Sequence, residues 1–145
     1  MMTTMPHKAT VLMALASALV EWLPADAESL LWISNWQAEQ IESFTLFHAA
    51  RRGHAEPRAL MEAPGHLVDL NSQTDRQIAA GLIFLVMAFG WEGYFASKQR
   101  GGFIYFGDEH LVFTTRNARQ LRQVTDYVAQ FHLQLIDDIR QAWDV

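Results

Sequence analysis

The segment between residues 90 and 115 constrains the fold most, because it alone has a clear β pattern. Residues 103–106 and 111–114 are rich in aromatic and β-branched side chains, and the Gly107, Asp108 and Glu109 between them are typical of a hairpin turn. Residues 91–96 are a candidate third strand, since three strands are far more stable than an isolated pair. The sequence therefore predicts a β-hairpin or a small three-stranded antiparallel sheet at about residues 91–115.

Helical spacing of apolar residues predicts four helices around this sheet. Their expected ranges are about 8–22, 26–52, 73–89 and 117–143. The third is apolar nearly all round from Ile78 onward, which is typical of a central, buried helix. Pro57, Pro64 and Gly65 predict a loop over residues 54–70.

Capping residues support the predicted helix starts. Asp26, Ser72 and Asn117 each stand where an N-cap is expected, and Asp75 follows Ser72 by three residues. The last helix has the most regular pattern, with apolar residues at intervals of three or four. These residues are Leu121, Val124, Val128, Phe131, Leu135, Ile139 and Trp143. We expect a single α+β domain over residues 1–145, with about four helices around a central apolar helix and the small sheet placed before a long C-terminal helix.

Composition excludes several classes of protein. The chain has 145 residues, half of them apolar, no cysteine and a formal net charge of −5. The lack of cysteine excludes disulfides, thiolate catalysis and cysteine-based zinc sites, and it favours a cytoplasmic location. The negative charge argues against nucleic acid as a partner, because phosphate binding depends on Lys and Arg.

Two apolar runs bear on membranes and export. The run at 78–89 has twelve residues, whereas a membrane-spanning helix needs about 20. Lys8, the apolar run at 9–20 and the small residues Ala25 and Ala27 imitate a signal peptide. Glu21 directly after that run favours an amphipathic helix instead. We therefore expect neither a membrane anchor nor a cleaved leader.

No motif predicts catalysis, and we assign neither catalytic residues nor a cofactor. The serines lie outside any Gly-x-Ser-x-Gly elbow, and no glycine-rich phosphate loop is present. His54, His66 and Asp69 share one loop and are the best candidates for a weak metal site. We assign no metal, and no pair of histidines has the i, i+4 helical spacing with a Glu between them that marks a metalloprotease.

Acidic and aromatic residues are the best candidates for partner contacts. They are Asp108 and Glu109 at the hairpin tip, Glu39 and Glu42 on the predicted second helix, and Trp36 beside them. Exposed Trp near acidic residues is typical of an interface hot spot. The alternatives are a plain solvated turn at the tip and a wide core face that covers Trp36.

These features favour a non-enzymatic protein-binding module, such as an immunity or inhibitor protein that neutralises a basic toxin or enzyme. An acidic inhibitor gains association rate when it meets a basic partner. Two alternatives remain open. One is an oligomeric scaffold or adaptor, for which a homodimer is conceivable. The other is an enzyme or small-ligand protein with a pocket between the third helix and the sheet.

Overall fold

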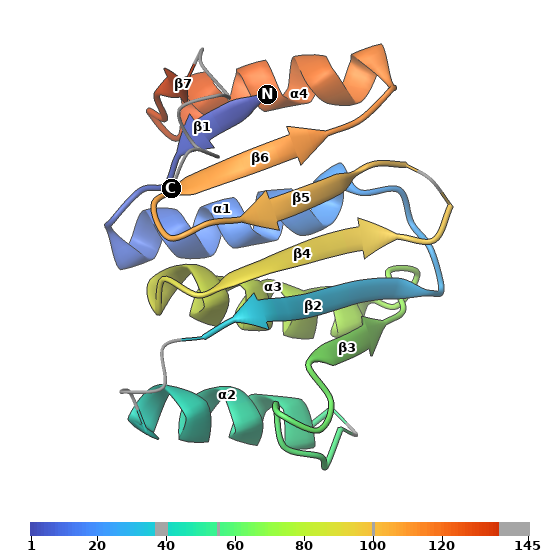
Figure 1. Cartoon of the computed structure of the whole chain (residues 1–145). Helices are drawn as coiled ribbons and strands as arrows, with labels where there is room; N and C mark the ends of the chain where they lie inside the picture. The colour runs from blue at the N-terminus through green and yellow to red at the C-terminus, as the bar shows by residue number, and fades with distance from the viewer. Residues whose placement is uncertain (37–40, 55, 100, 137–145) are drawn as a thin grey trace.

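The computed structural model describes residues 1–36, 41–54, 56–99 and 101–136. Within these residues the strands form one antiparallel sheet of seven, in the order β3-β2-β4-β5-β6-β1-β7 (Figure 1). The strands are β1 (Met2–Thr4), β2 (Ser29–Asn35), β3 (Gly65–Val68), β4 (Glu92–Ser97), β5 (Phe103–Phe106), β6 (His110–Thr114) and β7 (Leu135–Ile136).

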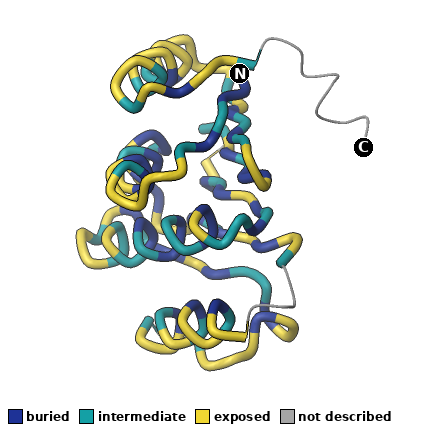
Figure 2. Tube along the Cα trace, turned by 90° about the vertical axis from the view of Figure 1, so that its left-hand side faces the viewer, coloured by how far each residue is buried: buried dark blue, intermediate teal, exposed yellow. Residues whose placement is uncertain are grey.

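Four helices in the described residues form a second layer. They are α1 (Ala9–Trp22), α2 (Ile41–Arg52), α3 (Gln73–Ala88) and α4 (Ala118–Gln130). In Figure 1, α1 and α3 lie behind the centre of the sheet, with α4 beyond α1 and α2 beyond α3. Figure 2 views the molecule from one end of the strands, with the helices on the left and the sheet on the right. Within the described residues no helix lies against the other face of the sheet.

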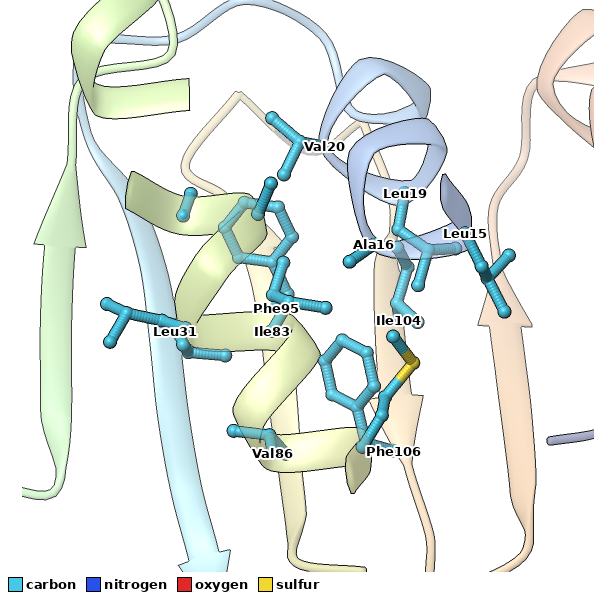
Figure 3. Packing of buried hydrophobic residues seen from close by; sticks show 14 of the residues in the cluster. Leu15, Ala16, Leu19, Val20, Leu31, Ile83, Val86, Phe95, Ile104 and Phe106 are labelled. Atoms are coloured by element: carbon cyan, nitrogen blue, oxygen red, sulfur yellow. The ribbon is translucent and has the colours of Figure 1, made fainter. Parts of the chain in front are cut away.

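The core lies between the sheet and the pair α1 and α3. Apolar side chains from both layers interlock there (Figure 3). The fully buried members include Leu15, Leu19, Ile83, Val86, Phe95, Ile104 and Phe106. Burial of such side chains contributes on the order of 2 kcal/mol each, so this layer is the main source of stability.

Several predicted elements are confirmed. The helices at 9–22 and 73–88 agree with expectation to within one residue at each end. The Ser72 side chain accepts a hydrogen bond from the backbone N–H of Asp75, as predicted, and Asn117 caps α4 in the same way. Gly90, with φ of +64°, follows the end of α3. Strands β4, β5 and β6 lie in the segment expected to be β.

The predicted fold class is wrong in its central feature, because the sheet is not a small inserted one. It has seven strands and runs the length of the molecule, so α3 packs on a sheet as well as against α1 and α2. Four strands were missed, and two of them, β1 and β7, have only three and two residues. Such short segments carry too few residues for period-two alternation to show.

Strand β2 replaces the first half of the predicted second helix. Leu31 and Ile33 are buried, whereas Leu30 and Trp32 lie on the opposite face, which is β alternation. Asp26 is not a helix cap. Its carboxylate accepts bonds from the Ser97 hydroxyl at 2.8 Å and the Gln99 backbone N–H at 2.9 Å, and so joins the start of β2 to the end of β4.

The long C-terminal helix is also wrong. Helix α4 ends at Gln130, and His132 then adopts a positive φ of 53° that reverses the chain. Leu135 lies in β7, which pairs with β1. Pairing with the N-terminus thus overrides the helical spacing of this segment. Ile139 and Trp143 lie outside the described residues.

No helix of the described residues combines the length and the apolar character that a transmembrane helix needs.

The two faces of β4 give a stability test. Phe95 is fully buried, whereas its neighbour Tyr94 is 37% exposed on the other face. Phe95→Ala should lower the free energy of unfolding by about 3–5 kcal/mol, because it leaves a cavity in the core. Tyr94→Ala should cost about 1 kcal/mol or less. Urea denaturation measures both, and equal losses would contradict the two-layer arrangement.

Candidate functional site

The side of the sheet that no described helix covers, which we call the open face, is a candidate site. Backbone alternation places Gly93, Phe95 and Ser97 of β4 toward the helices and Tyr94 and Ala96 away from them. The neighbouring strands follow the same rule through their register. Each of these strands therefore contributes every second side chain to the open face.

The open face carries an aromatic row across three strands. Trp32 pairs with Tyr94, and Tyr94 pairs with Tyr105, so the three side chains stand side by side. The Tyr94 and Tyr105 ring centroids are 5.0 Å apart. Trp32 is 43% exposed, and Gly65 of β3 is its partner on the other side. We call Gly65, Trp32, Tyr94 and Tyr105 the aromatic row.

A second row of open-face side chains lies two residues away along each strand. Leu67 pairs with Leu30, Leu30 with Ala96, and Ala96 with Phe103. Leu67 is 67% exposed and Phe103 is 36% exposed. We call these four residues the mixed row, because one small side chain, Ala96, stands among three large ones. Together the two rows form a continuous apolar surface over β3, β2, β4 and β5.

Charged groups lie at the two ends of this surface. Glu92, at the start of β4, accepts a bond of 3.2 Å from the Tyr105 hydroxyl. Burial and this carboxylate raise the pKa of Tyr105 to about 12, so the phenol stays neutral. At the other end Lys98 pairs with Glu28. Arg116 lines a cavity of about 470 Å³ with Ala96 and Phe103, and it has no ion-pair partner among the described residues.

The structure brings together only some of the predicted contact residues. Asp108 and Glu109 are exposed in the turn between β5 and β6, and Glu42 is exposed in the first turn of α2. Both turns lie at the same end of the sheet (Figure 1). Trp36 is half-buried and packs edge-on against Phe44, at 6.3 Å between ring centroids. Glu39 lies outside the described residues.

A partly buried polar cluster links the turn after α2 to β3 and α3. His54 Nε2 lies 3.1 Å from an Asp75 carboxylate oxygen, and His54 Nδ1 lies 2.8 Å from His66 Nε2. The Asp75 carboxylate also accepts the backbone N–H of Asp69, which holds the pKa of Asp75 below its usual value. Sequence analysis grouped His54 and His66 correctly but chose Asp69 as the carboxylate. In the sequence Asp75 stands out only as a capping residue of α3, so its contact with His54 was not predicted.

Hydrogen bonding determines which ring nitrogens of this cluster carry a proton. When His54 is neutral, the Asp75 carboxylate requires its proton on Nε2, so His54 Nδ1 accepts the proton of His66 Nε2. His66 Nδ1 is then a bare acceptor, and it is buried without a partner. Neither nitrogen of His54 is free for a substrate. The cluster therefore has the geometry of a structural tie rather than of a general base.

Arg51 is the second buried group of this region, and it is fully buried. One of its terminal nitrogens donates to the carbonyl oxygens of Ala63 and Gly65, and its guanidinium lies 5.9 Å from the centre of the Phe47 ring. Burial lowers the pKa of Arg51. Among the described residues no carboxylate lies within ion-pair distance. Arg51 thus clamps the segment that leads into β3.

Metal and pocket hypotheses find little support in the geometry. In the described part of the chain no three His, Asp or Glu side chains are arranged to hold a metal ion. A cavity of about 600 Å³ adjoins His54, His66, Glu56 and Arg58 at the β3 edge. The space between α3 and the sheet, where we had considered a ligand pocket, is filled by the core side chains of Figure 3.

Sequence analysis missed the open face as a site. Trp32 was assigned to a helix, and Tyr94, Tyr105 and Phe103 were treated only as strand formers. Each strand does show alternation in the sequence. The pairing of β2 with β4 joins segments about 60 residues apart, and local patterns do not report it.

Comparisons with protein-family models, with curated proteins and with solved structures found no match to this chain.

The polar cluster predicts a pH dependence of stability. Burial and the nearby charges of His54 and Arg51 lower the pKa of His66 from 6.5 to about 4. The unfolded chain therefore binds more protons than the folded one between these pH values, so stability falls as pH drops from about 6.5 to 4. The loss should be on the order of 1–3 kcal/mol.

Urea denaturation across this pH range measures the effect. His66→Gln should flatten the dependence, and His7→Gln at an exposed position should leave it unchanged. An unchanged slope in His66→Gln would show that His66 is not the titrating group.

Proposed function

We propose that this chain is a non-enzymatic protein-binding module and that the open face of its sheet is the contact surface. The observation that carries the proposal is the aromatic row, which stands on a sheet face that no described helix covers. One face of the sheet is buried in the core, and the other is available for contact with a partner. Because the chain has no cysteine, we also place it in a reducing compartment such as the cytoplasm.

Exposed apolar side chains are common singly, but a contiguous group of them indicates an interaction site. Here Trp32, Tyr94, Phe103 and Leu67 are all at least one-third exposed and belong to adjoining strands. Trp and Tyr are the residues most enriched at interface hot spots, because they bury a large area at a small cost in side-chain entropy. This composition fits a protein partner.

Charge argues against nucleic acid on the same surface. An aromatic sheet face can stack bases, but it also needs Lys and Arg for the phosphates. At this face Lys98 is neutralised by Glu28 and Arg58 by Glu56. Among the residues that the structure describes, that leaves Arg116 beside an aromatic surface of a chain with net charge −5.

Affinity capture with matched variants tests the proposal. Immobilised wild type, Trp32→Lys and Met13→Lys should be exposed to an extract of the source organism, where Met13 is 44% exposed on the helix side. A specific partner should bind wild type and Met13→Lys but not Trp32→Lys, because a charge in an apolar contact must be desolvated. A protein retained equally by all three would not use the open face.

An inhibitor of a basic toxin or enzyme is a second candidate function. It is favoured by one arrangement: the β5–β6 turn with Asp108 and Glu109 lies at the same end of the sheet as the first turn of α2 with Glu42. An acidic end of this kind would steer a basic partner.

Charge reversal at the turn tests this candidate. Asp108→Lys combined with Glu109→Lys should slow association with a basic partner and weaken the salt dependence of the rate, because long-range attraction is lost. Stopped-flow association at several salt concentrations measures both effects. Charge reversal at the remote Glu62, also exposed, is the control. Unchanged rates in the double variant would exclude the turn as a contact.

A further inference from the structure

We propose that the open face binds the open face of a second copy of this chain. The two sheets would pack face to face about a twofold axis that runs across the strands, between the aromatic row and the mixed row. This inference rests on the proposed function, in that it takes the open face as the contact surface and names its partner. Homodimers with such twofold symmetry are the commonest protein oligomers.

On two of the four strands the side chains are self-complementary in size under this symmetry. An axis across the strands keeps each strand opposite its own copy and exchanges the two rows. Tyr94 then lies on Ala96 of the second copy, and Leu67 lies on Gly65 of the second copy. Large side chains thus meet small ones on β4 and β3, as in facing sheets that interdigitate at a spacing of about 10 Å. On β2 and β5 the same axis sets Trp32 on Leu30 and Tyr105 on Phe103 of the second copy, so that large apolar side chains meet there.

The charges are self-complementary under the same axis, because it exchanges the two ends of each strand. Glu92 stands just before the aromatic row on β4, and Lys98 stands just beyond the mixed row at the other end of that strand. Each Glu92 therefore lies toward Lys98 of the second copy. Lys98 also pairs with Glu28 of its own chain, so these rim charges contribute to the orientation rather than to most of the affinity.

The area of the open face suits a dimer. The five strands from β3 to β6 span roughly 24 Å, and the six residues of β4 span roughly 20 Å. Protruding Trp, Tyr and Phe side chains make the accessible area larger than this flat footprint of roughly 500 Å². The result is on the order of the 800 Å² that each partner contributes to a standard interface.

Analytical ultracentrifugation of the purified chain tests the second copy directly. Wild type should pass from monomer to a species of twice 16.5 kDa as concentration rises. Tyr94→Lys should raise the dimer dissociation constant at least tenfold, and Met13→Lys on the helix side should leave it unchanged. Leu67→Lys, at a 67% exposed edge position, serves as a second variant of the open face should Tyr94→Lys fail to fold.

A size swap tests the twofold arrangement. Tyr94→Ala should weaken the dimer by leaving a void, and Ala96→Tyr should weaken it by setting two tyrosines against each other. The combined Tyr94→Ala and Ala96→Tyr variant should recover most of the wild-type affinity, because large again meets small across the axis. Dimers held by any other contact give no such recovery.

The outcomes separate this inference from the proposed function. If the wild type stays monomeric at about 100 µM, the proposal that a second copy binds the open face is wrong. It is also wrong if both Tyr94→Lys and Leu67→Lys leave the dimer intact. The capture experiment with Trp32→Lys still decides whether the open face binds a different protein. A dimer that Tyr94→Lys disrupts but the size swap does not restore overturns the twofold arrangement.

Discussion

The packing of α1 and α3 on one face of the sheet is the constraint from which the other features follow. It fixes which side chains of every strand are buried, because a shift of one residue in any register would turn the core residues to the solvent. Phe95 and Ile104 face the helices, and therefore Tyr94, Phe103 and Tyr105 face away from them. The apolar open face is thus a direct consequence of the way the core is built.

Sequence analysis predicted those parts of the fold that depend on residues close together in the sequence. The caps at Ser72 and Asn117, the helix at 9–22 and strands β4 to β6 all follow from short-range patterns. Strand β2 was missed because Leu30 and Ile33 also fit helical spacing and continue into the true helix α2. The helix expected to reach residue 143 ends at Gln130, since the following segment pairs with β1 through contacts more than 100 residues apart.

The site residues show the same division. His54 and His66 were grouped because they lie close in the sequence, and the structure joins them at 2.8 Å. The carboxylate was misassigned because Asp75 approaches from another element. The aromatic row was not predictable, since its members come from three strands and only the register aligns them. Asp108 and Glu109 were correctly placed in an exposed turn, and their role in binding stays a proposal.

Hydroxyl-radical footprinting over a range of protein concentrations tests the central claim most directly, because it reports each side chain separately. At low concentration, Trp32, Tyr94 and Phe103 should be oxidised readily, while their strand neighbours Phe95 and Ile104 stay protected. As concentration rises, protection should spread to the first three residues. Equal oxidation of Tyr94 and Phe95 at low concentration would contradict the account, because it would mean that the sheet does not have one covered and one open face.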